Sequence, residues 1–215
     1  MTEIAFGVWD GKAFDTRPEA ADTTDTAVPD FALKGFDAFD PGNPIRAFFG
    51  DRGFFVFDDS TSLVDALYHY MAKAAEQSCG ACTPCRMGTV LVRDALDKMR
   101  RGLATPGTGA LSFEELEMLG VQMAETSLCG LGQTCGIALN GALQNFRDRM
   151  EEELAPRRPI PSQHGMTYVT APCIEACPSK VNVPRYIDYV RDGKPENSLG
   201  VLLQKYPMAA TCGRV

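Results

Sequence analysis

Several features are missing from this 215-residue sequence, and each absence excludes a class of protein. No apolar run approaches the roughly 20 residues that a membrane-spanning helix needs. The first residues, Met1 to Ala5, lack the basic start and apolar core of a secretory signal. Net positive charge is also absent, since the chain carries −7, which argues against nucleic acid as a partner. These absences predict a soluble, cytoplasmic protein without direct membrane insertion.

A glycine-rich nucleotide-binding motif is absent as well. The 78 residues before Cys79 contain no run of glycines of the dinucleotide-binding type. The loop over residues 103–110 is rich in Gly, Thr and Pro, but it lacks the Gly-Lys-Ser/Thr ending of a phosphate-binding loop. We therefore expect no FMN, FAD or NAD on this chain alone, and a self-contained NADH dehydrogenase is disfavoured.

What the sequence does contain is cysteine. Eight cysteines in a chain without a secretory signal predict metal ligands in a reducing compartment, and not a disulfide framework. Cys79, Cys82 and Cys85 follow C-x-x-C-x-x-C spacing, which aims three thiolates at one small object. Zinc sites usually combine one C-x-x-C pair with a distant second pair. The triple run therefore favours an iron–sulfur cluster, with a structural zinc site as the alternative.

The residues around this triplet fit such a site. Gly80 allows a tight turn where a side chain would crowd a cluster. Thr83 is expected as a helix N-cap, with Pro84 as the first helical residue. Cys85 then lies in the first helical turn, where free N–H groups and the helix dipole favour a thiolate. Arg86 adds a positive charge beside an anionic cluster.

A fourth ligand has to come from a distant segment. Cys129 follows Cys85 by 44 positions, and the two helices expected between them would return the chain to its starting point. Cys135 is the rival, six residues further on. We prefer Cys129, because the glycines that follow it leave room for a cluster to approach the backbone.

Apolar residues recur at helical spacing in four segments between residues 60 and 154. The first expected helix begins at Ser60 or Thr61, and the second runs from Pro84 to Arg101. The third begins at the capping box Ser112–Glu115, and the fourth spans Ile137 to Leu154. Residues Glu151 to Glu153 are interpreted as a solvated helix face. The fold class is therefore mainly α: a small four-helix bundle that holds a cluster at one end in two loops.

The segments on either side of this bundle divide the rest of the chain. Residues 1–46 are predicted to be an acidic, extended arm, and the iron–sulfur domain covers residues 47–154. The phenylalanine-rich start of that domain predicts a short β element over residues 47–57. A proline-rich linker over 155–170 then leads to a helical tail over 171–215.

The cysteine segments resemble a known family. Ser-Cys-Gly-Ala-Cys-Thr-Pro-Cys-Arg-Met-Gly from residue 78, with Ser-Leu-Cys-Gly-Leu-Gly-Gln-Thr from residue 127, is similar to the iron–sulfur domain of the NADH-binding flavoprotein subunit of complex I. Related subunits of NAD-dependent hydrogenases and formate dehydrogenases share it. The resemblance runs from about Gly50 to Leu154. It implies one [4Fe–4S] cluster, with ligands Cys79, Cys82, Cys85 and Cys129.

The tail resembles a second family. Pro172-Cys173-Ile174-Glu175-Ala176-Cys177-Pro178, two proline-opened helices and Cys-Gly-Arg-Val look like the start of the helical ferredoxin-like domain of the glutamate synthase small subunit and dihydropyrimidine dehydrogenase. The resemblance implies ligand positions at Cys173 and Cys177, whereas Cys212 matches a non-ligand position. The family's preceding C-x-x-C pair is replaced by Met166 to Thr170. We therefore expect a docking element without a complete cluster of its own.

Together these features predict an electron-transfer subunit with one [4Fe–4S] cluster, in an NAD(P)-linked or flavin-based oxidoreductase complex. Its partners would be other redox subunits that carry flavin or iron–sulfur groups, and the chain itself would have no catalytic residue. The alternative is a structural metal-binding assembly module of such a complex.

Overall fold

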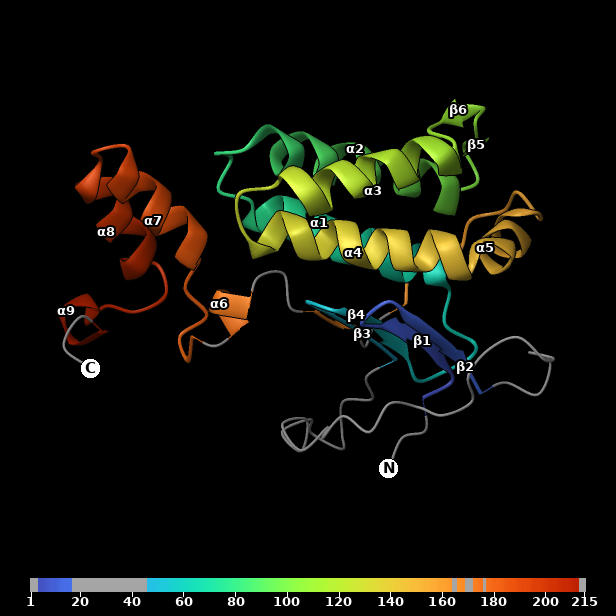
Figure 1. Cartoon of the computed structure of the whole chain (residues 1–215), viewed down its shortest axis with the longest axis horizontal. Coiled ribbons are helices and arrows are strands. Elements are labelled where there is room, and N and C mark those ends of the chain that lie inside the picture. Colours follow the sequence, from blue (N-terminus) through green and yellow to red (C-terminus); the bar gives the residue numbers. More distant parts are fainter. Residues whose placement is uncertain (1–3, 17–45, 164–165, 169–171, 176, 213–215) are drawn as a thin grey trace.

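The computed structural model describes residues 4–16, 46–163, 166–168, 172–175 and 177–212. This part of the chain is mainly helical, with a small sheet against one side of the helices (Figure 1). The long helices are α1 (Leu63–Gln77), α2 (Thr83–Arg100), α3 (Phe113–Thr126) and α4 (Gly130–Asn145). They pack on one another, and α4 also contacts the sheet. Within these residues, no helix has both the length and the apolarity to cross a membrane.

The sheet has five strands in the order β2-β1-β4-β3-β7. Its strands are β1 (Phe6–Trp9), β2 (Lys12–Asp15), β3 (Ala47–Gly50), β4 (Gly53–Val56) and β7 (Met166–Tyr168). All neighbours are antiparallel except β3 and β7. Side chains alternate between the two faces of a strand, so Phe49 and Phe54 enter the main core while Phe48 and Phe55 join an outer cluster. Phe49 stacks on Tyr70 of α1, with ring centroids 4.9 Å apart.

Two segments that were expected to lack secondary structure contain strands. Residues 4–16 do not extend as an arm, because β1 and β2 form a hairpin that pairs with β4. The linker expected over 155–170 contains β7, which pairs with β3. Strand β1 pairs with β4 and strand β7 pairs with β3, and local composition does not reveal partners so distant in sequence. The rest of the expected arm, residues 17–45, lies outside the described residues.

The first helix is capped differently from the expectation. Its N-cap is Ser62, whose hydroxyl accepts from the Asp65 backbone N–H at 3.1 Å, and not Ser60 or Thr61. The carboxylate of Glu153 accepts from the N–H groups of Leu63 and Val64 at 3.0 and 3.2 Å. Glu153 is therefore not part of a solvated face, because it satisfies the free N–H groups of α1.

The last long helix also differs. It begins at Gly130 instead of Ile137, and a break at Phe146 separates it from α5 (Arg147–Leu154). Phe146 leaves helical geometry with φ −132° and ψ 28°, and its ring lies 5.0 Å from that of Phe6. Packing of this ring against β1 accompanies the break, whereas the apolar pattern alone predicts one continuous helix. The capping box of Ser112 and Glu115 is present as predicted.

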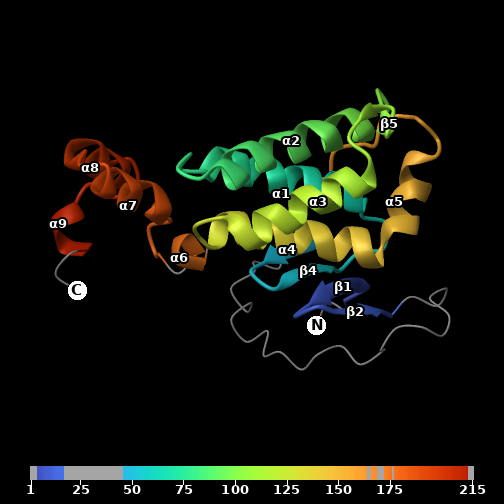
Figure 2. The same ribbon diagram turned by 45° about the horizontal axis from the view of Figure 1, so that its top comes forward.

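The tail contains α6 (Pro172–Glu175), α7 (Val183–Arg191), α8 (Pro195–Leu203) and α9 (Ala209–Cys212). Proline stands in the first turn of α7 and α8, as the sequence predicts. Figures 1 and 2 show α7 and α8 beyond the cysteine-bearing end of α1 to α4. Ile174 joins the main core, and Asn182 Nδ2 donates to the Gln77 carbonyl at 2.7 Å. The tail is therefore fastened to α1.

Helices α3 and α4 approach closely at two glycines. A Cβ on Gly136 would lie 2.3 Å from the carbonyl oxygen of Gly120 and 2.6 Å from the Ala124 nitrogen. Both neighbours are backbone atoms of α3, so the helices would have to separate to admit even one methyl group.

Gly136→Ala should therefore lower the free energy of unfolding by about 1–3 kcal/mol. Gly141→Ala, on the same helix, is the matched control, because its Cβ would meet only side-chain atoms of Val8, at 3.3 Å or more. Urea unfolding followed by circular dichroism measures both variants. Equal stability of the two variants would contradict the close α3–α4 contact.

A buried carboxylate ties α1 to α2 and to the segment before β7. Asp65 has no exposed side-chain surface, and it pairs with Arg100 Nη1 at 3.3 Å. Its other oxygen accepts from the Gln163 backbone N–H at 2.9 Å. Burial alone would raise the pKa of Asp65, but the hydrogen bonds from His69 and Gln163 and the charge of Arg100 lower it overall.

Asp65→Asn should cost about 1–3 kcal/mol of stability at neutral pH, because it removes a charge on which buried donors converge. A lowered folded-state pKa stabilises the fold above the unfolded value of about 3.9, and this contribution is lost as the pH falls through the folded pKa. The difference between wild type and variant should therefore shrink in acid-induced unfolding. Glu76→Gln, which breaks the exposed pair with Lys73, is the control and should change little.

Candidate metal centre

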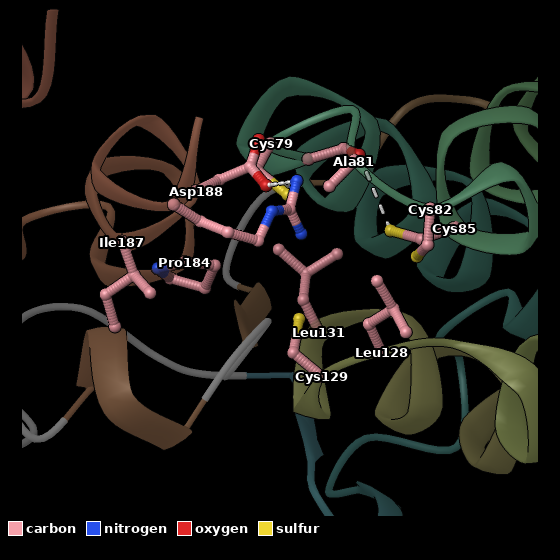
Figure 3. Close-up of a pocket in the computed structure, with 12 residues that line it drawn as sticks. Cys79, Ala81, Cys82, Cys85, Leu128, Cys129, Leu131, Pro184, Ile187 and Asp188 are labelled. Carbon is pink, nitrogen blue, oxygen red and sulfur yellow. Dashed lines mark hydrogen bonds and ion pairs between the residues drawn. The ribbon is translucent and has the colours of Figure 1, made fainter. Parts of the chain in front are cut away.

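Four cysteines from two separate loops line one pocket (Figure 3). Cys79 and Cys82 lie between α1 and α2, Cys85 lies in the first turn of α2, and Cys129 lies between α3 and α4. The pocket has a volume of about 180 Å³, several times the share of one water molecule in the liquid. It therefore has room for a group of several atoms.

Two of these cysteines occupy helix N-caps. Cys82 precedes α2 and Cys129 precedes α4, and neither helix has a side-chain hydrogen bond at its cap or an acidic residue in its first turn. In α1 and α3 the same position is a serine, with acidic residues following in the first turn. The N–H groups and positive dipole ends of α2 and α4 are thus available to negative charge in the pocket. The expected N-cap, Thr83, is instead the first helical residue of α2.

The loop that carries the triplet is held by its own polar groups. Gly80 has φ +84°, a left-handed conformation that glycine adopts without strain. Arg86 Nη1 donates to the Gly80 carbonyl at 2.8 Å, so this arginine braces the loop and is not among the residues that line the pocket. Ser78 Oγ lies 3.5 Å from Cys85 Sγ, within hydrogen-bonding distance for sulfur.

Burial affects the acidity of two of the thiols. It raises the pKa of Cys85 to about 11, against a smaller opposing effect from the Ser78 hydroxyl. It also raises the pKa of Cys79, although a hydrogen bond from the Ala81 backbone opposes the change. Both thiols are protonated at neutral pH without a metal, so binding of a metal group has to release protons.

Cys135, the rival for the fourth position, lies elsewhere. Its side chain is fully buried in the main core and does not line the pocket. Burial raises its pKa strongly, and it is hydrogen-bonded to the Tyr70 hydroxyl. Cys135 therefore behaves as a small core residue.

Gly132, one of the two glycines that follow Cys129, lies against other residues of the protein. A Cβ on Gly132 would lie 2.2 Å from Ser127 Oγ and 2.9 Å from Cys85 Cβ. The missing side chain thus makes room for Ser127 and Cys85, which brings α4 up against the first turn of α2.

The pocket also has a wall that the sequence analysis missed. Pro184, Ile187, Asp188 and Arg191 of α7 line it opposite the cysteines. They stand at positions i, i+3, i+4 and i+7, which places them on one face of the helix. This spacing was visible in the sequence, but nothing local indicated which surface the face would meet.

The spread of the thiols bears on the kind of metal group. Among the described residues, no three Cys, His, Asp or Glu side chains come close enough to hold a single metal ion. A structural zinc needs its sulfurs about 2.3 Å from one atom, whereas a four-iron cluster binds each thiolate through a different iron. Four thiols around a pocket of this size fit the larger group better.

The tail cysteines lie apart from this pocket. Cys173 is exposed and Cys177 is partly buried, and neither contributes to the pocket lining. The structure therefore brings together the four cysteines from the two bundle loops and leaves Cys173 and Cys177 outside.

Comparison with protein families finds two matches along the chain. Residues 65–153 match the model described as NADH-ubiquinone oxidoreductase-F iron–sulfur binding region. Residues 162–215 match the model described as dihydropyrimidine dehydrogenase domain II, 4Fe-4S cluster. The first match contains all four pocket cysteines, and the second contains α7.

Several curated relatives are similar to this chain over most or all of its length. The NADP(+)-dependent formate dehydrogenase subunit beta of Moorella thermoacetica is 29% identical over 256 residues, covering 100% of this chain and 34% of the relative. The NADPH-Fe(3+) oxidoreductase subunit beta of Geobacter sulfurreducens is 27% identical over 219 residues, covering 100% and 31%. The NADP-reducing hydrogenase subunit HndC of Solidesulfovibrio fructosivorans is 27% identical over 159 residues, covering 73% and 31%.

The chain thus spans about a third of the length of these relatives. The two family matches follow one another along it with a gap of only a few residues. The chain therefore contains two regions in series that are similar to iron–sulfur family models, first the NADH-ubiquinone oxidoreductase-F iron–sulfur binding region and then dihydropyrimidine dehydrogenase domain II.

Proposed function

We propose that this chain transfers electrons through one [4Fe–4S] cluster held by Cys79, Cys82, Cys85 and Cys129. The observation that carries the proposal is the meeting of these four thiols in one pocket at the N-termini of two helices. When bound, such a cluster takes up and releases single electrons.

The chain's own residues would make the pocket suitable for that group. The free N–H groups of α2 and α4 and the Ala81 N–H supply hydrogen-bond donors to a negatively charged site. Leu128 and Leu131 line the pocket beside Cys129, and this apolar contact limits water around the ligands. We infer that α1 to α4 act as a four-helix bundle that holds the two ligand loops at one end.

The relatives suggest the kind of complex in which this chain works. They include beta subunits of NADP(+)-dependent formate dehydrogenase and NADPH-Fe(3+) oxidoreductase. We propose that this chain works in a complex of the same kind, NAD(P)-linked or flavin-based, with other redox subunits as partners. Nucleotide and flavin would bind outside these 215 residues.

Replacement of the fourth ligand tests the cluster. Cys129→Ser should abolish or alter the EPR signal of the reduced protein and lower its iron content from about four per chain. Cys135→Ser is the matched control, because its thiol lies in the core and should affect stability alone.

If Cys135→Ser removes the EPR signal and Cys129→Ser leaves it intact, Cys135 is the fourth ligand and Cys129 is not. A colourless protein with stoichiometric zinc after anaerobic purification would reject electron transfer altogether and favour a structural assembly module.

A second prediction concerns the number of clusters. The region matched to the second family contains three cysteines, Cys173, Cys177 and Cys212, and a four-iron cluster normally needs four. We propose that the tail carries no cluster on its own. The double replacement of Cys173 and Cys177 by serine should leave the iron content at about four and the EPR spectrum unchanged.

Anaerobic reconstitution followed by iron and sulfide analysis makes this measurement. An iron content near eight in the unmodified chain, falling by half in the double variant, would show that the tail holds a cluster.

A further inference from the structure

The cysteine pocket is completed by a helix from the other domain. Four residues of α7, Pro184, Ile187, Asp188 and Arg191, form one of its walls, and Figure 3 shows Ile187 and Asp188 across from the cysteines. Neighbouring residues of α7 lie outside this wall, including Val190 with 59% exposure and Asp192 just beyond the helix. The contact is thus made by one defined face.

The position of this wall is tied to the ligand loop itself. Asn182, the N-cap of α7, donates through Nδ2 to the carbonyl of Gln77 at 2.7 Å. Gln77 is the last residue of α1, and Cys79 follows two positions later. The stem of the cysteine loop and the start of α7 are therefore joined directly, so the wall does not depend on a distant hinge.

The wall presents charge to the pocket. Asp188 pairs with Arg191 one turn along the helix, and the Asp188 side chain is only 13% exposed. Asp188 and Arg191 line the same pocket as Cys79. A charge beside the ligands acts on the oxidised and reduced forms of a cluster to different extents.

We propose that the 184–191 face of α7 is part of the cluster site, where Asp188 and Arg191 set the reduction potential and Ile187 limits access. These are positioning residues, because they act on the ligands and their surroundings without binding the metal. The proposal rests on the cluster assigned above to the four cysteines. Under this proposal, the tail helix α7 contributes to the cluster site between the two cysteine loops without binding a metal itself.

Two charge variants of the whole chain, reconstituted anaerobically, test the electrostatic part. Asp188→Asn removes a negative charge and should favour the reduced form, raising the midpoint potential in an EPR-monitored titration. Arg191→Gln should lower it. Each equilibrium constant should change by about three- to tenfold, tenfold being 59 mV for a one-electron couple. Glu196→Gln is the control, since Glu196 is an exposed residue of α8 that does not line the pocket, and it should shift the potential little.

Two apolar variants test access. Ile187→Ala should speed the loss of iron to an added chelator several-fold, because it opens the wall beside the cysteines. Val190→Ala should not, although it makes the same kind of truncation at a similarly exposed position of α7. Chelator kinetics are followed by absorbance.

Opposite shifts from the two charge variants, together with faster iron loss in Ile187→Ala alone, would support the proposal. Potentials and iron loss that match the controls would overturn it, even with the cluster present. If the unmodified chain gives no EPR signal that Cys129→Ser removes, the proposed function itself is rejected.

Discussion

Of the four long helices, α1 to α4, two have a cysteine at the N-cap and two have a serine. A helix start leaves backbone N–H groups without partners, and Ser62 and Ser112 satisfy such groups in α1 and α3. Cys82 and Cys129 take the same position in α2 and α4 without making that hydrogen bond. The N-terminal ends of both helices therefore meet at one pocket, which their cysteines line. The rest of the architecture serves to bring these two helix starts together.

That meeting depends on close packing and on remote contacts. Helices α3 and α4 touch at Gly120 and Gly136, and Gly132 lets α4 approach the first turn of α2. The sheet supports the assembly from the side, through the stack of Phe49 on Tyr70. Tyr70 is in turn hydrogen-bonded to Cys135, which is buried in the same core as the pocket residue Cys85.

The helical tail completes the pocket that the two cysteine loops form. By itself, the pocket between the two loops would open toward solvent on the side that α7 covers. The hydrogen bond from Asn182 to Gln77 and the burial of Ile174 hold the tail in place. Some other apolar side chains of α7 and α8 stay exposed, among them Val190 and Leu203, whereas Val201 is buried. Even so, one face of the tail already has a defined neighbour within this chain.

Features that depend on a few adjacent residues could be predicted from the sequence. These include the mainly helical fold, the capping box at Ser112 and the proline-opened helices of the tail. The two family resemblances were predicted too, because they rest on cysteine spacing and adjacent residues. Tertiary structure alone decided the hairpin of residues 4–16, the capping of α1 by Glu153, and the wall formed by α7. Each of these joins segments far apart in the chain, and periodicity or composition cannot specify a partner that lies outside its own window.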